Sequence, residues 1–390
     1  MKYLFIVLWV PGVFGQTKLT LEQLLEWYQP MLQNHIENQM IVAEMERNLA
    51  RVWENPNLTF TSEKVSRSPF DERESYWILS QTIAHPNVLA GNKEIGRSRQ
   101  ETLIWRGKIQ TQELKANLVR LFFNALTAQK ETQVTTHWVS EMNSLSEVIG
   151  YREDAGQVSG FDRRKWALER VRAQTDLAKV KAQFEAYQTQ LAQLMGLEMP
   201  VFLEGETLPE NPPLLSAEQM PAIKEKQALV QEAIGFEKKT KTWGIEKVEL
   251  ELGHKSVDQG GFTDSGSFLG LRIPLPVWNH GRSALTKAKA ERALIKQELE
   301  WTTKNQTAKN LALRAQTISM IQAAREFRAK LDEVDALVSI GKLAYREGEM
   351  DILSLLNTLE TERDLWLQYL SLCQETRSLW IELHVLGGAL

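Results

Sequence analysis

The chain has 390 residues, a formal net charge of −4 and a pI near 6.0, and it contains no run of five or more basic residues. A nucleic-acid-binding domain would present a basic face, so this composition excludes nucleic acid as the expected partner. The single cysteine, Cys373, excludes an internal disulfide and a metal cage of cysteines, and the six histidines are too scattered for a metal motif. We expect no cofactor and no bound metal.

Residues 1–15, MKYLFIVLWVPGVFG, have the pattern of a secretory signal peptide. Lys2 gives a positive start, an apolar run follows, and the segment ends in small residues. Pro11 and Gly12 interrupt the run, which makes it too short for a transmembrane helix. We predict an exported protein without an N-terminal lipid anchor, because no cysteine follows the predicted cleavage site. An ordinary hydrophobic tail is the alternative.

The rest of the chain contains two copies of one pattern, displaced by 192 residues. The aligned landmarks are Ser75 with Ser267, Leu79 with Leu271, Gly156 with Gly348, and Gly196 with Gly388. Such a displacement predicts a tandem repeat, with a first repeat at 16–198 and a second at 222–390. The segment 199–221 between them holds five of the twelve prolines and is predicted to be a linker.

Each copy begins with a predicted helix followed by two short strands. The helices are expected at 29–56 and 220–243, and the strands at 57–66, 75–84, 245–254 and 267–276. In VELEL, Val248, Leu250 and Leu252 alternate with glutamates, which is the period of a strand with one apolar face. In SFLGLRIPL, leucines and Ile273 alternate in the same way as far as Leu275.

A long helical hairpin completes each copy. No glycine or proline occurs from Lys108 to Ile149 or from Arg282 to Ile340, and at 1.5 Å per residue such helices reach roughly 60 and 90 Å. The returning helices are expected at 162–195 and 349–386. Apolar residues recur at alternating spacings of three and four, the seam of a coiled coil. Cys373 lies on this seam, so we predict a buried, unreactive thiol.

Four strands are too few to form a closed barrel, and open sheet edges cannot face lipid because their unpaired backbone groups each cost several kcal/mol. Three chains that pool four strands each would give twelve, enough to enclose water. In such a barrel the leucines of VELEL would face lipid and Glu249 and Glu251 would line the water-filled lumen. Amphipathic strands also occur in soluble sheets, so a sheet without a pore remains the alternative.

Three segments carry a resemblance to a known family: NPNL (Asn55 to Leu58), GLRIPLPVWNHGR (Gly270 to Arg282) and YREGEMDILSLLNTLETER (Tyr345 to Arg363). A fourth segment, from Gly156 to Gly196, indicates a branch of that family. The chain resembles the TolC-like outer membrane efflux proteins, and the fourth segment is similar to their heavy-metal and drug efflux branch. The resemblance implies a mainly α fold with a small β part, formed by long antiparallel hairpins and four strands. It also implies a homotrimer with a 12-stranded barrel in the outer membrane and an α-barrel across the periplasm.

The resemblance further implies docking of the hairpin tips onto a periplasmic adaptor (a membrane fusion protein) that is joined to an inner-membrane pump. By position, the expected docking and gating residues are Tyr151, Arg152, Asp154, Gly156, Asp162, Tyr345, Arg346, Gly348 and Asp351. We expect Tyr345 and Arg346 to face Asp154 or Asp162 in the closed entrance. Glycine permits each turn, and Asp162 or Asp351 can cap the returning helix or lie in its first turn. Ser354 and Asn357 stand where some members carry an acidic ring, so that kind of cation selectivity is not implied.

The function predicted from these features is a passive outer membrane conduit for metal ions or drugs, located in the outer membrane with a periplasmic extension. A conduit for secreted polypeptides, as in type I secretion, and an exported coiled-coil scaffold without a pore are the alternatives. An enzyme is not expected, because no catalytic constellation or phosphate-binding loop occurs in a strand-to-helix setting.

Overall fold

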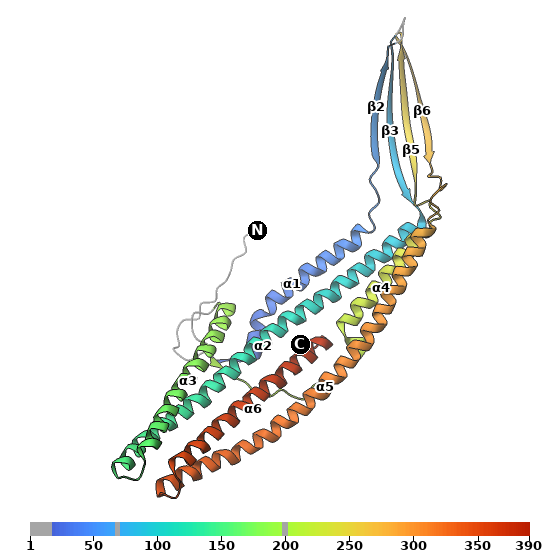
Figure 1. Ribbon diagram of the computed structural model, residues 1–390. Helices are drawn as coiled ribbons and strands as arrows, with labels where there is room; N and C mark the ends of the chain where they lie inside the picture. The colour runs from blue at the N-terminus through green and yellow to red at the C-terminus, as the bar shows by residue number, and fades with distance from the viewer. Residues whose placement is uncertain (1–17, 67–70, 197–201) are drawn as a thin grey trace. The chain divides into compact units, whose positions relative to one another are not determined.

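The computed structural model describes residues 18–66, 71–196 and 202–390 (Figure 1). The predicted signal peptide and the start of the proline-rich segment lie outside these residues. The fold is mainly α with a small β part, as predicted. No helix in the described part of the chain is both long enough and apolar enough to cross a membrane.

The elements follow the same order in the two halves of the chain (Figure 1). The first half contains α1 (Leu21–Leu49), β2 (Asn57–Val65), β3 (Glu72–Ala84), α2 (Pro86–Asp154) and α3 (Gly160–Met195). The second half contains α4 (Pro221–Lys239), β5 (Lys247–Gln259), β6 (Phe262–Arg272), α5 (Arg282–Glu347) and α6 (Ile352–Gly387). Three short elements complete the fold: β1 (Lys18–Leu19), β4 (Phe202–Leu203) and the 3₁₀ helix η1 (Ala217–Gln219). The division into repeats at 199–221 stays a prediction.

The chain separates into two compact units. The hairpin unit consists of the described residues of Met1–Leu32, Gln112–Leu214 and Lys309–Leu390. The sheet unit consists of the described residues of Gln33–Thr111 and Leu215–Ala308.

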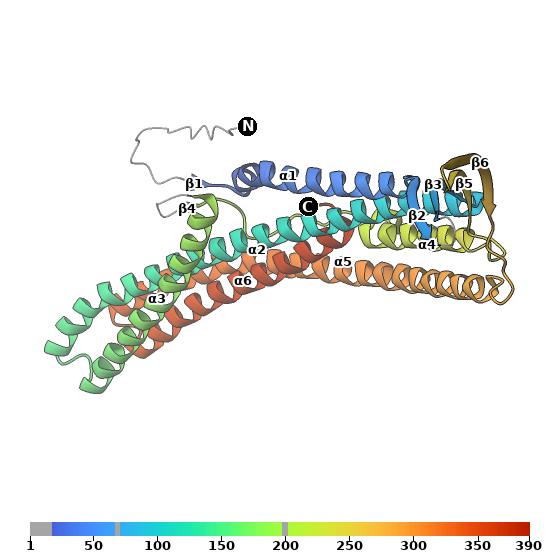
Figure 2. The same ribbon diagram turned by 90° about the horizontal axis from the view of Figure 1, so that it is seen from above.

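The sheet of the sheet unit has four antiparallel strands in the order β2-β3-β5-β6. The two halves of the chain meet in the centre of this sheet, where β3 pairs with β5, and β2 and β6 are its edges (Figures 1 and 2). The prediction that the last strand continues through Ile273 and Leu275 is wrong, because β6 ends at Arg272. Pro274 follows, and proline has no N–H to donate to a strand ladder.

Helix α2 starts at Pro86, so the predicted start at Lys108 is wrong. Glycines inside a helix normally weaken it, but here they let helices of the sheet unit approach closely. A Cβ on Gly91 would lie 2.7 Å from the backbone nitrogen of Lys239, and one on Gly235 would lie 3.0 Å from that of Ile95. These close contacts explain why glycine is compatible with a continuous helix at this place.

Helix α1 begins at Leu21, before the predicted start at residue 29, and includes Pro30. A reciprocal capping box precedes it: the Gln23 N–H donates to Thr20 Oγ1 at 3.3 Å, and the Thr20 N–H donates to Gln23 Oε1 at 3.0 Å. Helices α1 and α4 end at Leu49 and Lys239, before the stop signals at Asn55-Pro56 and Trp243-Gly244. The ends predicted at 56 and 243 were therefore too late.

The core of the hairpin unit is formed by apolar side chains from the long helices. One cluster, with Phe122, Leu126 and Leu191, includes Leu203 of β4. The Gln129 amide fixes this strand by donating to the Leu203 carbonyl at 2.9 Å and accepting from its N–H at 2.8 Å. Arg377, which is buried, donates to the carbonyls of Glu206 and Thr207 at 2.9 and 3.2 Å. The described beginning of the proline-rich segment is therefore packed against the helices of this unit.

Candidate functional site: the hairpin tips and the sheet faces

The first hairpin tip turns at Gly156, which lies just after α2 and has a positive φ of 73°. Ser159 is the N-cap of α3: its Oγ accepts the Asp162 N–H at 3.1 Å and donates to Asp162 Oδ2 at 2.7 Å. Asp162 therefore lies in the first turn of α3, one of the two positions predicted for it. Asp154 is the last residue of α2.

The second tip turns at Gly348, with φ of 84°, and here aspartate is itself the cap. Asp351 accepts the Ser354 N–H at 2.8 Å through one carboxylate oxygen and the Ser354 hydroxyl at 2.7 Å through the other. These hydrogen bonds favour the charged form and hold the pKa of Asp351 below its usual range. Ser354 therefore supports the turn in this structure.

Arg152 joins the two tips within the hairpin unit. Its guanidinium lies over the Tyr345 ring, 4.5 Å from the ring centroid, and donates to the Arg346 carbonyl oxygen at 2.8 Å. Tyr345 is only 1% exposed and belongs to the apolar cluster beneath the tips, with Ile149 and Leu355. Burial raises its pKa. The structure therefore brings together three of the predicted tip residues: Arg152, Tyr345 and Arg346.

The expected contact of Tyr345 or Arg346 with an aspartate is not among the contacts within the described residues. The acidic partner at the first tip is Glu153, which forms an ion pair with Arg163. The first tip also exposes two aromatic rings, Tyr151 and Phe161. Sequence reasoning missed Glu153, Arg163 and Phe161, although the ten-residue spacing of the ion pair across a glycine turn is a usable signal.

The polar face of the sheet carries Glu249 and Glu251, and both are bound to one arginine. Arg272 on the neighbouring strand β6 donates to Glu249 Oε2 at 3.0 Å, and its other terminal nitrogen lies 2.6 Å from Glu251 Oε1. Lys255 continues the same face and binds Glu74 at 2.9 Å. The negative charges of Glu249 and Glu251, the predicted lumen residues, are therefore partly neutralised by Arg272. The strand pattern alone did not indicate this partner.

The opposite face of the sheet carries an exposed apolar band across all four strands. Residues directly paired on neighbouring strands share a face, so the register places eight large apolar side chains together. They are Leu58 and Phe60 on β2, Trp77 and Leu79 on β3, Leu250 and Leu252 on β5, and Leu269 and Leu271 on β6. An exposed apolar patch of this extent on a sheet face indicates an interaction surface for a membrane or for another protein.

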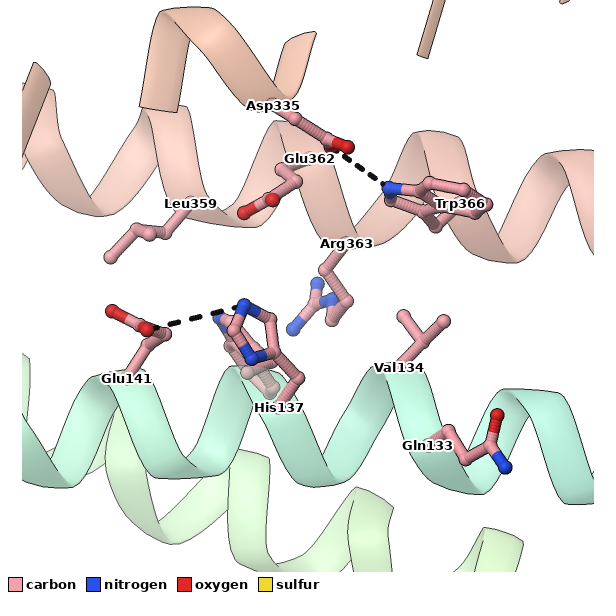
Figure 3. A pocket seen from close by; sticks show the side chains of 10 residues that line it. Gln133, Val134, His137, Glu141, Asp335, Leu359, Glu362, Arg363 and Trp366 are labelled. Atoms are coloured by element: carbon pink, nitrogen blue, oxygen red, sulfur yellow. Dashed lines mark hydrogen bonds and ion pairs between the residues drawn. The ribbon is translucent and has the colours of Figure 1, made fainter. Parts of the chain in front are cut away.

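A cavity of about 310 Å³ lies in the hairpin unit between α2 and the α5–α6 hairpin (Figure 3). The Trp366 indole donates to Asp335 Oδ1 at 3.1 Å, and Arg363 lies 3.9 Å from the Trp138 ring centroid. Burial raises the pKa of Glu362, and the nearby negative charge of Asp335 raises it further. Carboxylates and cations are mixed here, so the walls are suited to ordered water rather than to one ion type.

The predicted burial of Cys373 is confirmed, and this burial raises the pKa of its thiol, which disfavours the reactive thiolate. In the part of the chain that the structure describes, no group of three or more histidine, cysteine, aspartate or glutamate side chains could hold a metal ion.

Comparison with solved structures identifies the class: the chain has the fold of the TolC-like outer membrane channels, which confirms the resemblance found in its sequence. CusC, studied for transmembrane channel formation, superposes with a TM-score of 0.77 at 12% identity, covering 98% of this chain and 95% of that one. The Neisseria gonorrhoeae outer membrane channel MtrE, in its open state, gives 0.74 at 14% identity, covering 95% and 89%. The predicted outer membrane location agrees with these relatives.

Among curated proteins, the chain is similar to the cobalt-zinc-cadmium resistance protein CzcC of Cupriavidus metallidurans. The two sequences are 22% identical over 284 residues, which is 68% of this chain and 65% of that protein. The match therefore spans slightly less than two thirds of the relative. No family model matches the chain.

Proposed function

We propose that the protein is the subunit of a homotrimeric outer membrane channel that passively conducts substrate out of the periplasm. The observation that carries this proposal is the sheet: its exposed apolar band covers one face, its charged network covers the other, and its edges β2 and β6 have no partner strand among the described residues. Unpaired edges cannot remain in lipid, and edge pairing between three copies gives a closed barrel of twelve strands.

The channel is proposed to belong to a tripartite efflux system, with the hairpin tips docking on a periplasmic adaptor that is joined to an inner-membrane pump. The exposed Tyr151 and Phe161 of the first tip supply apolar contact surface for such a partner. Metal ions are the favoured substrate over drugs or polypeptides, because the curated relative is a metal resistance protein.

The experiment is to purify the protein in detergent, run it unheated and heated on a gel, and insert it into planar lipid bilayers. The expected result is a trimer that dissociates on heating and single-channel conductance in the bilayer. Leu252→Arg, on the apolar band, should prevent stable insertion, since arginine on the lipid face near the bilayer midplane costs about 2–4 kcal/mol. Ser256→Arg, at a half-buried residue on the same face of β5, is the matched control for depth, because the cost falls to about 0–1 kcal/mol near the membrane surface. A water-soluble monomer without conductance would support the coiled-coil scaffold and contradict the channel.

The substrate is tested by export in a strain that lacks its own channel of this class. Restored cobalt, zinc or cadmium resistance, when adaptor and pump are supplied, supports metal efflux. Secretion of a polypeptide in place of metal resistance would instead support the type I secretion alternative.

A further inference from the structure

The cavity in the hairpin unit, lined by side chains of α2, α5 and α6, contains polar groups to which the proposed conduit assigns no role (Figure 3). All of its lining side chains belong to one unit of one chain, so the cavity is complete without a second copy. Its volume of about 310 Å³ lies at the lower end of the range of about 300–1,000 Å³ that is typical of small-molecule sites. A ligand of this cavity would therefore be small.

The apolar part of the lining consists of two indoles and two aliphatic side chains. Trp138 comes from α2 and Trp366 from α6, and Val134 and Leu359 complete this part. Aromatic and aliphatic walls of this kind bury a flat apolar ring well, and tryptophan also has an N–H that needs a partner when it is buried. The lining therefore favours a ligand with an aromatic body.

Two carboxylates of the α5–α6 hairpin form no ion pair with a described residue. Asp335 accepts the Trp366 indole N–H at 3.1 Å, and Glu362 is half-buried. The third carboxylate of the cavity, Glu141, differs from them because Lys342 lies 2.6 Å from it. Burial raises the pKa of Glu362, and the negative charge of Asp335 raises it further, as expected for two acids that share no cation. A positively charged group of a ligand would stabilise both.

Two N–H donors of the same cavity are buried and have no hydrogen-bond partner among the described residues, Arg363 Nη1 and Trp138 Nε1. Trp138 is only 3% exposed. The other side-chain nitrogens of Arg363 are engaged, because Nε and Nη2 lie 2.8 and 2.7 Å from Asp364 Oδ1. A buried donor without an acceptor costs about 1–3 kcal/mol, so a ligand that supplies an acceptor would remove this cost.

The two kinds of group lie on different sides of the cavity. Figure 3 shows Asp335 and Glu362 on the side of the α5–α6 hairpin, with the Arg363 guanidinium extending from that side toward α2. This guanidinium lies 3.9 Å from the ring centroid of Trp138, which belongs to α2. The cavity therefore presents an acidic side and a donor side to one ligand.

We propose that this cavity binds a small aromatic zwitterion, with its ammonium group against Asp335 and Glu362 and its carboxylate against Arg363 Nη1 and the Trp138 N–H. A simple organic cation would leave the two buried donors unpaired, and a simple anion would lie beside two carboxylates that have no cation. Ordered water serves these groups when the ligand is absent. A passive conduit needs no binding site in its wall, so the inference goes beyond the proposed function and does not depend on it.

The test is equilibrium dialysis of the purified protein in detergent against radiolabelled L-tryptophan. Two competitors each lack one charge: tryptamine has no carboxylate, and indole-3-propionate has no ammonium group. The expected result is saturable binding of one tryptophan per chain, with both competitors about tenfold weaker, the loss expected for one charged hydrogen bond. Absence of saturable binding would overturn the proposal. Equal affinity for the three compounds, as partition into detergent micelles would give, would also overturn it.

Two substitutions that keep the shape of the side chain test the acidic side. Asp335→Asn and Glu362→Gln should each weaken the binding of tryptophan and tryptamine about tenfold and should not weaken that of indole-3-propionate. Glu333→Gln is the matched control, because Glu333 lies on the same helix as Asp335 but is exposed, pairs with Lys330 and does not line the cavity.

Equal weakening of all three compounds by Asp335→Asn and Glu362→Gln would indicate a structural effect and would overturn the assignment of the ammonium group. Unchanged tryptophan binding in both variants would do the same. Conductance is measured on the same preparations, so a trimer that conducts but binds no tryptophan would overturn this site and leave the proposed channel intact.

Discussion

The two hairpin tips carry the same three residues, Tyr-Arg-Glu, in opposite environments. Tyr151 at the first tip is 77% exposed, whereas Tyr345 at the second is 1% exposed and lies under the guanidinium of Arg152. The arginine of the first motif thus covers the tyrosine of the second. The two motifs both lead into a glycine turn, but their tyrosines lie in different surroundings: Tyr151 is exposed, and Tyr345 contacts Arg152 and so joins the two tips.

The largest difference between the tips should appear on removal of the two tyrosine rings. Tyr345→Ala leaves a cavity in a packed cluster and should cost about 3–5 kcal/mol, whereas Tyr151→Ala should change stability by less than about 0.5 kcal/mol. Thermal unfolding followed by circular dichroism measures both variants. Tyr345→Phe keeps the ring under Arg152 and should lose much less than Tyr345→Ala. Equal effects of Tyr151→Ala and Tyr345→Ala would remove the contrast between the tips.

The turn glycines should instead behave alike, because both need a positive φ and both have open space around them. Gly156→Val and Gly348→Val should each cost about 1–2 kcal/mol through backbone strain alone. Asparagine, which tolerates the left-handed region, is the control at each position. If the tips dock on an adaptor, Gly348→Val should also abolish export from trimers that remain assembled on a native gel. Normal export by assembled Gly348→Val trimers would argue against docking at this tip.

The helix caps should differ in their response to pH. Asp351 caps α6 through its carboxylate, so Asp351→Ala should cost about 1 kcal/mol at neutral pH, as should Ser159→Ala at the other cap. The folded-state pKa of Asp351 is lowered, so its contribution is fully present above the unfolded pKa, near 4, and is lost as the pH falls through the lower folded value. Stability measured from pH 6 down to about pH 3 in wild type and Asp351→Asn tests this. A difference between the two proteins that stays constant with pH would contradict the assignment.

The smallest effect is expected for the bridge between the tips. Arg152→Ala removes the stacking on Tyr345 and the hydrogen bond to the Arg346 carbonyl, and should cost about 0.5–1 kcal/mol because the arginine is partly solvated. Arg152→Lys should retain part of this value. Single-channel conductance tests a second role of Arg152. If Arg152 holds the tips closed, Arg152→Ala should raise the open probability of the channel. An unchanged open probability would show that Arg152 contributes to packing alone.

The sequence predicted those parts of the fold that depend on local interactions. Glycine at each turn, capping residues after it and heptad spacing on each side are short-range signals, so the hairpins were found with nearly correct ends. The start of α2 was missed because Gly91 is favourable only where another helix passes close by, which no local pattern records. The burial of Tyr345 and the pairing of Arg272 with Glu249 and Glu251 were missed for the same reason, since both depend on contacts between separate elements.

The central pairing of β3 with β5 also has a consequence for how the protein matures. Ala84 is paired with Lys247, so the middle of the sheet joins residues 163 positions apart in the chain. When the chain emerges from an export machinery with its N-terminus first, the β2–β3 ribbon appears long before its companion and exposes Phe60 and Trp77 to water. Strand pairings between segments far apart in the chain form slowly, and the intermediates that precede them are prone to aggregation. Delivery of this protein should therefore depend on a holding chaperone that escorts the early ribbon until the second half of the chain arrives.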